Sequence, residues 1–264
     1  MVTAWSLDNT PDYMVVDLAA TNTVRYYPGV EFLPDSKIRQ NGAQSGAVTN
    51  NPVYKTSKLL MRKIMTRGVE WTMGSADGET LRTAASEEPH AVTLTNNYYI
   101  GVFEVTQSQW KNIATNSSLA ANFTVDGAMR PMEKTSYNEI RNAANSTTAD
   151  PSYDWPADPN PSSFLGLLRS KTGLDFDLPS EAQWEFAARA GNGSGFWNNG
   201  SEVQNLYRDT NLDALGRNLH NNPTGESNTA AERMDPSLAP ENGGTASDRR
   251  RPWPGAVRPR SRRA

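Results

Sequence analysis

Short apolar runs separated by turn residues predict strands in the first part of this chain and helices in its middle. The segments "KLLMRKIM" and "VEWTMGS" have strand length, and Gly68 marks the connection between them. The segment "HAVTLTNNYYIGVFEV" holds two more such runs on either side of the polar pair Asn96 and Asn97. We therefore expect four strands between residues 58 and 105.

Residues 1–55 contain shorter apolar runs interrupted by Pro, Asn and Gly, and we interpret them as an N-terminal extension of short strands and loops. Within it, the first 20 residues are typical of two alternating strands with a turn at 9–11. They lack a basic region followed by an apolar one, so no signal peptide is recognisable. No apolar run approaches the length of about 20 residues that a membrane span needs.

Four helices are predicted from their end signals. Three begin with a capping box, in which a hydroxyl accepts a backbone N–H and a side chain three positions later reaches back. The pairs are Thr106 with Gln109, Ser136 with Glu139, and Ser180 with Gln183. The fourth, "SSFLGLLRSKTG", places Phe164, Leu167 and Leu168 on one face and ends at Gly173. Gly191 is expected to end the helix that Ser180 begins.

The segment "LPSEAQWEFAARAG" is the most regular of these helices. Leu178 and Pro179 lead into it, and Trp184, Ala187 and Ala188 share a face that we expect to be core.

Two carboxylates of that helix, Glu181 and Glu185, stand one turn apart. A glycosidase-like or metal-binding pair is conceivable. The favoured interpretation is a capped structural helix whose glutamates bond to backbone or solvent, with Glu181 and Arg189 complementing the two ends of the helix dipole.

Charge is distributed unevenly. Seven of the 26 Lys and Arg residues lie at or after Arg249, which leaves 19 basic against 29 acidic residues, a net charge of -10, in the rest. A body this acidic is not drawn to phosphates, so it predicts no nucleic-acid partner. The chain has no cysteine, which excludes disulfides, thiolate catalysis and metal sites built on sulfur.

Several motifs occur in a specific order: "WTMGS", "EEPHAVTL", "YYIGVFEVTQSQW", "RPMEKTSYNEIR" and "GLDFDLPSEAQWEFAARAG". Together they resemble the formylglycine-generating enzyme (sulfatase-modifying factor) family. The resemblance runs from about residue 59 to 246 and is most specific at 176–191. Its motif residues are Gly74, His90, Glu104, Thr106, Gln109, Trp110, Leu178, Pro179, Ser180, Glu181, Trp184, Glu185 and Arg189.

The resemblance implies an α+β, C-type-lectin-like, loop-rich domain over residues 56–248, after the extension at 1–55 and before a basic tail at 249–264. Family members that oxidise a substrate cysteine to formylglycine bind copper through two cysteines near the C-terminus. Neither can be present here, so the resemblance implies a truncated and catalytically inactive member.

The resemblance also suggests a structural calcium ion. Asn211 and Leu212 correspond to a family segment in which an Asn side chain and the next carbonyl bind Ca²⁺, and oxygen ligands suit this cation. The acidic partner expected shortly before "GGTA" is not evident, because Pro240 stands there with Glu241 beside it. A solvent-facing Asn211 is therefore the favoured interpretation.

The two histidines give little evidence for a catalytic triad. His90 stands where the family has a histidine at the start of a strand, and a structural role is favoured over catalysis. His220 lies in an Asn-rich stretch and carries no motif.

The tail has two open interpretations. If codons 252–258 are read from their second base, they can encode a segment close to the family's "GLYD" motif, so a frameshift could have replaced the rest of the domain. The alternative is a basic arm for nucleic acid or anionic lipid, but the tail has one aromatic residue, Trp253, and three prolines that oppose a membrane helix.

Two functions follow. The first is a sulfatase-modifying-factor domain without catalysis. The second is a monomeric, lectin-like module whose region 192–228 displays loops to a protein or glycan ligand. The sequence assigns neither a ligand nor a compartment.

Overall fold

The computed structural model describes residues 7–19, 23–34, 48, 51–79, 82–83, 85–115, 127–142, 150–190 and 210–211, and the backbone of 256–258. The chain divides into two compact units. The first comprises residues 1–67, 95–179 and 252–264, and the second comprises 68–94 and 180–251. None of the helices in the described ranges is long and apolar enough to cross a membrane.

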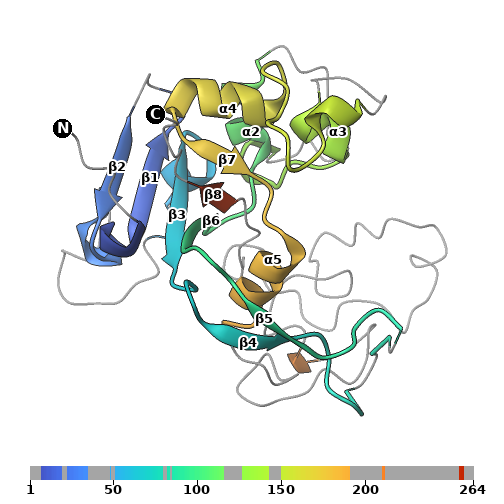
Figure 1. Ribbon diagram of the computed structural model, residues 1–264. Coiled ribbons are helices and arrows are strands. Elements are labelled where there is room, and N and C mark those ends of the chain that lie inside the picture. The colour runs from blue at the N-terminus through green and yellow to red at the C-terminus, as the bar shows by residue number, and fades with distance from the viewer. Residues whose placement is uncertain are drawn as a thin grey trace, which may run out of the picture. The chain divides into compact units, whose positions relative to one another are not determined.

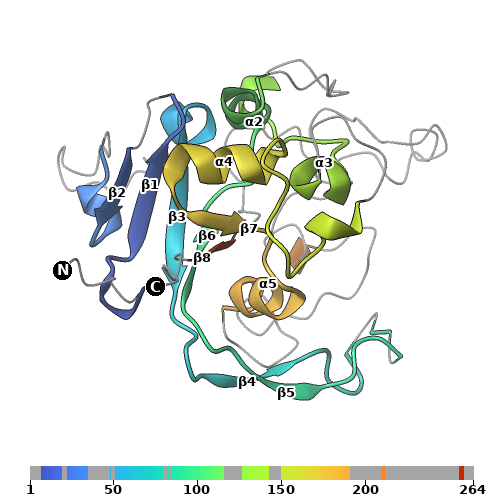
Figure 2. The same ribbon diagram turned by 45° about the horizontal axis from the view of Figure 1, so that its top comes forward.

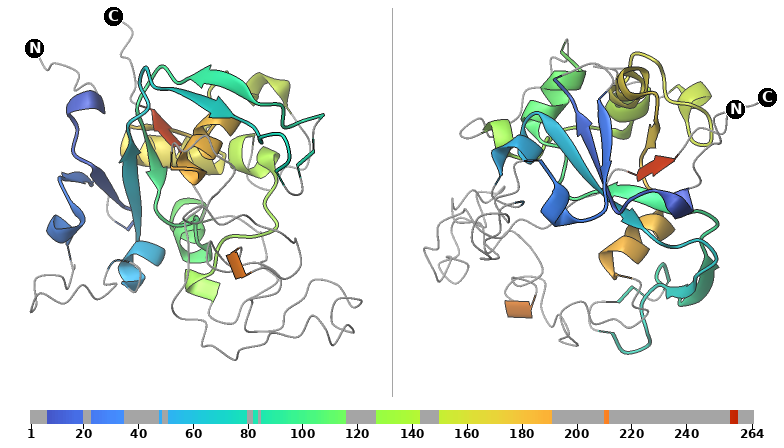
Figure 3. Two further views of the ribbon diagram at one scale, coloured as in Figure 1. Left: turned by 90° about the horizontal axis from the view of Figure 1, so that it is seen from below. Right: turned by 90° about the vertical axis from the view of Figure 1, so that its left-hand side faces the viewer.

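The first unit is built on a six-stranded sheet with the strand order β2-β1-β3-β6-β8-β7, in which every neighbouring pair is antiparallel (Figure 1). The pairing of β1 with β2 and β3 can also be followed in Figure 3. The strands are β1 (Tyr13–Asp17), β2 (Val24–Tyr27), β3 (Lys58–Ile64), β6 (Tyr98–Gly101), β7 (Asp175–Asp177) and β8 (Ala256–Arg258).

Both faces of this sheet are covered, because alternate residues of a strand point to opposite sides. In β1, Met14 and Val16 join one core cluster, and Val15 between them joins another. The first cluster also takes residues from β3, β6, β7 and two helices, so α2 and α4 cover this face (Figure 2). The second contains Leu60, Tyr54 and Phe103.

The helices of the first unit are α2 (Gln107–Ile113), α3 (Tyr137–Arg141) and α4 (Phe164–Thr172). Among the described residues, five 3₁₀ turns accompany them: η1 (Leu7–Asn9), η2 (Val30–Phe32), η4 (Pro52–Lys55), η5 (Gly127–Met129) and η6 (Pro151–Tyr153). The capping boxes predicted at Thr106 and Ser136 are confirmed. Helix α4 ends at Gly173 with φ 70°, the left-handed conformation expected there.

The second unit contains the antiparallel pair β4 (Glu70–Met73) and β5 (His90–Thr93), and helix α5 (Glu181–Ala188). Helix α5 begins with the predicted capping box of Ser180 and Gln183. It packs on β4 through Phe186, whose ring meets Trp71 edge-on with centroids 5.4 Å apart. The four strands predicted between residues 58 and 105 are therefore confirmed as β3, β4, β5 and β6.

The predicted core face of α5 is wrong. Ala188 is exposed and Trp184 and Ala187 are only half-buried, whereas Gln183 and Phe186 are buried. The reason is that the Phe186 ring, which packs on Trp71, turns a different side of this short helix inward.

The start of the chain also differs from expectation. Residues 7–9 form a 3₁₀ turn rather than part of a strand, because the N–H and hydroxyl of Thr10 both donate to the Leu7 carbonyl. Ala190, with φ 53°, takes the left-handed conformation after α5; the predicted helix end at Gly191 lies outside the described residues and stays a prediction.

The predicted division of the chain at residue 55 stays a prediction. Strand β1 of the predicted extension nevertheless pairs along its whole length with β3, so these strands share one sheet. The basic tail contributes β8, which lies between β6 and β7, and this placement leaves both interpretations of the tail's origin open.

Candidate functional site

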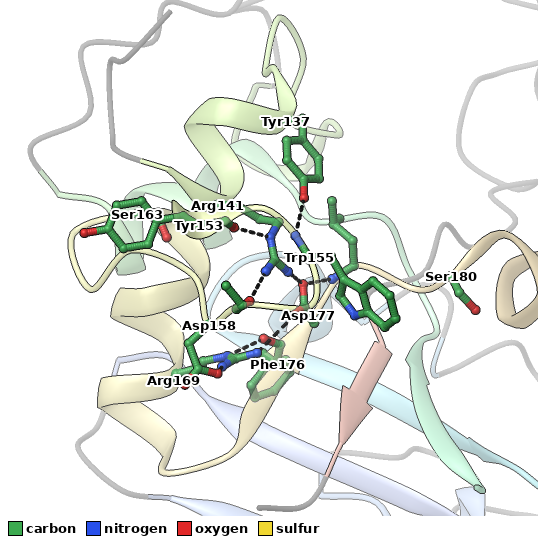
Figure 4. Close-up of polar contacts among 12 residues, drawn as sticks. Tyr137, Arg141, Tyr153, Trp155, Asp158, Ser163, Arg169, Phe176, Asp177 and Ser180 are labelled. Atoms are coloured by element: carbon green, nitrogen blue, oxygen red, sulfur yellow. Dashed lines mark hydrogen bonds and ion pairs between the residues drawn. The ribbon is translucent and has the colours of Figure 1, made fainter. Parts of the chain in front are cut away.

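Arg141, whose side chain is 1% exposed, belongs to a set of four ion-paired side chains of the first unit that we call the Asp177 cluster: Arg141, Asp158, Arg169 and Asp177 (Figure 4). Asp177 ends β7, Arg141 ends α3, and Arg169 lies in α4. Arg141 is an ion-pair partner of Asp177, and Arg169 Nη2 lies 3.1 Å from Asp177 Oδ2. The cluster therefore ties two helices to the edge strand of the sheet.

Hydrogen bonds to the backbone complete the cluster. Arg141 donates to the carbonyls of Tyr153 at 3.2 Å and Ala157 at 2.5 Å, and Arg169 donates to that of Phe176 at 2.7 Å. Asp177 also accepts the N–H of Leu178 at 2.8 Å. Buried charges are tolerated only when they are paired and hydrogen-bonded. The ion pair and the carbonyl bonds of Arg141 therefore allow its side chain to be only 1% exposed.

The sequence analysis missed this cluster. Arg141 and Arg169 are 36 and 8 positions from Asp177, so no helical or strand period joins the three residues. The available signal was Asp177, an acidic residue between the apolar Phe176 and Leu178.

Thr106 and Gln109 of the "TQSQW" motif join α2 to the chain before β3. The Thr106 hydroxyl donates to the Lys55 carbonyl at 2.7 Å. Gln109 Nε2 donates to the carbonyls of Tyr54 at 3.0 Å and Lys58 at 2.7 Å, and its Oε1 accepts the Thr106 N–H at 2.9 Å. Every polar atom of the Gln109 side chain is used in this way, and the amide is 1% exposed.

Two other motif residues of the first unit, Trp110 and Leu178, pack in its core. The Trp110 ring stacks on Phe164 with centroids 4.2 Å apart and an angle of 5° between the planes. Leu178 packs against the core cluster, and Glu104 and Pro179 are half-buried.

In the second unit, Glu185 is the polar centre of the motif residues. Its Oε1 accepts the Gly74 N–H at 3.0 Å and the Arg189 Nε at 2.7 Å. Glu181, by contrast, is exposed, so the two carboxylates of α5 have different surroundings. Glu185 is therefore bonded within the fold while Glu181 faces solvent, and this difference does not favour a catalytic pair of carboxylates.

Two further motif residues lie where β4 and β5 meet. Gly74 directly follows β4, and His90 is the first residue of β5. Gly74 has φ +97°, and a Cβ there would lie 2.8 Å from the carbonyl oxygens of Glu87 and Glu88. His90 begins β5, pairs with Met73, and its Nδ1 lies 2.7 Å from the Glu88 carbonyl. Both residues thus lie against the backbone of residues 87–88, just before β5.

Two tyrosines of β6 have perturbed acidity. Burial raises the pKa of Tyr98 above its ordinary range. Burial also raises the pKa of Tyr99 to about 12, although a hydrogen bond with Thr10 lowers it in part. Both phenols therefore stay protonated near neutral pH and do not serve as bases there.

Metal ligands are not assembled in the described ranges, where no group of three or more His, Cys, Asp or Glu side chains could hold a metal ion. Asn211 is half-buried, while Leu212, His220 and Glu241 lie outside the described residues. Copper held by thiolates does not fit this chain, because its sequence has no cysteine.

Residues 51–237 match the model of the family described as sulfatase-modifying factor enzyme 1-like domain. This match covers more than half of the chain, so the chain belongs to that family. Its α+β architecture is the C-type-lectin-like fold of formylglycine-generating enzymes, as the sequence motifs predicted. No curated protein matches the chain.

Two solved structures are similar to parts of the chain. PvdO from Pseudomonas aeruginosa is 21% identical, with 56% of this chain and 55% of that chain covered and a TM-score of 0.34. Treponema denticola variable protein 1 is 18% identical, with 64% and 63% covered and a TM-score of 0.34. The chain therefore spans less than two thirds of either protein.

Proposed function

We propose that this chain is a sulfatase-modifying-factor domain that does not catalyse cysteine oxidation. The observation that carries the proposal is the absence of cysteine from all 264 residues. The oxidation that the family resemblance implies depends on copper held by cysteine thiolates, and no other residue type supplies a soft thiolate ligand.

The contacts of the motif residues support the same proposal. Gln109 bonds to three backbone groups, and Glu185 bonds to Gly74 and Arg189. A general acid or base must reach the proton that it transfers. Side chains used in this way stabilise the fold, so Gln109 and Glu185 have structural rather than catalytic roles.

The test is a peptide oxidation assay. The full chain is incubated with a cysteine-containing sulfatase peptide, copper, a reductant and oxygen, and formylglycine is measured by mass spectrometry. A family member that has both copper cysteines serves as the positive control. We expect no aldehyde above the level of copper without protein, and aldehyde that depends on this chain would refute the proposal.

A second candidate function is a binding module for a protein or glycan. The observation that favours it is Trp155, which is 61% exposed on a loop fixed from beneath by a buried arginine. Exposed aromatic residues on rigid loops are typical of recognition surfaces. The region 192–228, which the sequence favoured for display, lies outside the described residues.

The structural calcium ion that the family resemblance suggests at Asn211 and Leu212 stays the alternative to a solvent-facing Asn211, which the sequence favours. An amide oxygen followed by a carbonyl oxygen suits this hard cation, although the expected carboxylate partner is not evident in the sequence. Thermal melts in calcium and in chelator provide the test. A higher melting temperature in calcium, abolished by Asn211→Ala, supports the site, and identical melts refute it.

A further inference from the structure

We propose that β6 and β7 form an acceptor site for an extended strand, and that two copies of this chain associate by filling each other's site with β8. The exchanged segment is short and defined, Ala256–Arg258 of the basic tail. The inference does not depend on either function proposed above. It concerns the first unit alone, because all three strands belong to that unit.

Strand β8 is placed by strands that are distant from it in the sequence. It lies between β6 and β7 and pairs antiparallel with both (Figure 1). It begins at residue 256, which comes 79 positions after the end of β7 at Asp177 and 155 positions after the end of β6 at Gly101. By contrast, β1 ends at Asp17 and its partner β2 begins at Val24. No short turn can therefore fix β8 to either neighbour.

Both walls of the acceptor site are held by contacts that do not involve β8. Strand β6 pairs along its whole length with β3. Strand β7 is tied to α4 through the Asp177 cluster, where Arg169 Nη2 lies 3.1 Å from Asp177 Oδ2. Tyr99 of β6 and Phe176 of β7 also belong to the same core cluster. A site with walls fixed in advance accepts an added strand at a lower entropic cost.

The outer edge of β7 is already in use. The Phe176 N–H donates to the Leu174 carbonyl at 3.0 Å, and the Phe176 carbonyl accepts Arg169 Nε at 2.7 Å. Successive residues of a strand turn their backbone groups to opposite edges. Asp175 and Asp177 therefore present theirs to β8, and the inner edge is the one that a strand joins.

The sequence of the tail matches this site in length and charge. Arg258 lies directly opposite Asp175 in the pairing of β8 with β7. Opposite charges at facing positions of an antiparallel pair stabilise it, whereas like charges destabilise it. Pro254 and Pro259 stand on either side of β8, and because proline has no N–H, the ladder is limited to the residues between them.

A second copy of the chain offers the same strand. Residues 180–251 belong to the second unit, so the chain returns to the first unit through a long connection. Exchange of an identical element between copies preserves the contacts of that element and is a low-cost route to a dimer. The seven arginines at or after Arg249 are basic and the rest of each copy has a net charge of -10, so the tail of one copy is attracted to the body of another.

The first experiment uses the full chain with Val257→Pro, which removes an N–H from the middle of its own β8. The probe is a fluorescein-labelled peptide with the sequence of residues 250–262, and binding is measured by fluorescence anisotropy at physiological salt. We expect the peptide to bind this variant at least about tenfold more tightly than wild type, whose site is filled.

A control peptide separates strand pairing from attraction by charge. It carries Val257→Pro in the same sequence, so its charge is unchanged but it cannot complete the ladder. It should bind the Val257→Pro chain at least about tenfold more weakly than the unchanged peptide does. Circular dichroism establishes that the Val257→Pro chain is folded before binding is measured.

The second experiment tests exchange between copies and needs no proline substitution. The full-length variants Asp175→Arg and Arg258→Asp each place like charges opposite one another within one chain. When they are mixed, each site can take the other copy's tail with opposite charges matched. We expect about fivefold more dimer in the mixture than in either variant alone, measured by light scattering after size-exclusion chromatography.

The double variant, with Asp175→Arg and Arg258→Asp in one chain, restores the match within that chain and should behave as wild type. Three results would overturn the inference. Equal binding of the peptide to wild type and to folded Val257→Pro would place its site elsewhere. Equal binding of the proline-containing peptide would show attraction by charge alone. A mixture with no more dimer than its components would show that the copies do not exchange β8.

Discussion

The carboxylate of Glu185 accepts the backbone N–H of Gly74 at 3.0 Å, although the two residues are 111 positions apart in the sequence. The same oxygen accepts the Nε of Arg189 at 2.7 Å, one helical turn further on. Within the second unit, one side chain of α5 thus joins the helix to the residue that follows β4. This relationship explains why the glutamate and the glycine both belong to the family motif.

Removal of this carboxylate should destabilise the protein. Glu185→Ala takes an acceptor from both Gly74 and Arg189, and we expect a loss of about 2–4 kcal/mol in the free energy of unfolding. Glu181→Ala, on the exposed first turn of the same helix, should cost less than about 1 kcal/mol. Urea unfolding of both variants measures the difference, and equal losses would show that the Gly74 contact contributes nothing.

A substitution at Gly74 tests the other side of the contact between Gly74 and Glu185. A Cβ at its φ of +97° would lie 2.8 Å from the carbonyl oxygens of Glu87 and Glu88, so Gly74→Ala combines backbone strain with a clash. We expect a loss of about 3 kcal/mol or more. Gly78 is a suitable control because it has a similar φ of +85° but open space around the position of a Cβ.

Gly78→Ala should therefore cost only the strain, about 1 kcal/mol. Thermal or urea unfolding compares the two variants under identical conditions. A Gly78→Ala variant as unstable as Gly74→Ala would attribute the whole effect to backbone conformation rather than to the close approach of the 87–88 carbonyls.

Asp177 provides the third prediction. Asp177→Asn leaves Arg141 and Arg169 with buried charge and one less carboxylate, and we expect it to cost about 3–5 kcal/mol. Asp158→Asn removes an exposed partner of the same Arg169 and should cost less than about 1 kcal/mol. Circular dichroism during urea unfolding provides the measurement. Similar losses in the two variants would contradict the central role of the buried carboxylate.

Local signals made much of this fold predictable. The capping bonds of Thr106, Ser136 and Ser180 each join residues three positions apart, so the sequence around each cap contains the whole motif. The buried side of α5 was not predictable in this way. It depends on the packing of Phe186 against Trp71, a residue 115 positions earlier in the chain, and the small alanines gave a misleading helical face.

The candidate sites show the same division. The sequence singled out Glu185 and Gly74 as motif residues, but their bond became evident only in the folded chain. Arg141 and Trp155 belonged to no motif. Their significance comes from long-range geometry: a buried guanidinium binds the carbonyls on both sides of an exposed ring, and no period in the sequence encodes this arrangement.

Tyr99 makes stability depend on pH in the alkaline range. Its hydroxyl lies 2.8 Å from Thr10 Oγ1 and also donates to the Pro11 carbonyl. Burial raises its pKa to about 12, with smaller increases from Tyr26 and Asp12 and an opposing effect of the Thr10 hydrogen bond. The ordinary pKa of tyrosine is about 10, so the folded state favours the protonated phenol.

The sign of the effect follows from linkage. Stabilisation by a group whose pKa is raised on folding is complete below the unfolded pKa of about 10 and is lost as the pH rises toward about 12. We expect Tyr99→Phe to cost about 1 kcal/mol at pH 8, because the hydroxyl contacts are lost. Since phenylalanine does not ionise, the difference between variant and wild type should narrow above pH 10.

Urea unfolding at pH 8, 10 and 11 measures this difference, and Tyr99→Phe should retain part of the alkaline decline because burial also raises the pKa of Tyr98. A difference between Tyr99→Phe and wild type that stays constant with pH would mean that the Tyr99 phenol ionises alike in the folded and unfolded states.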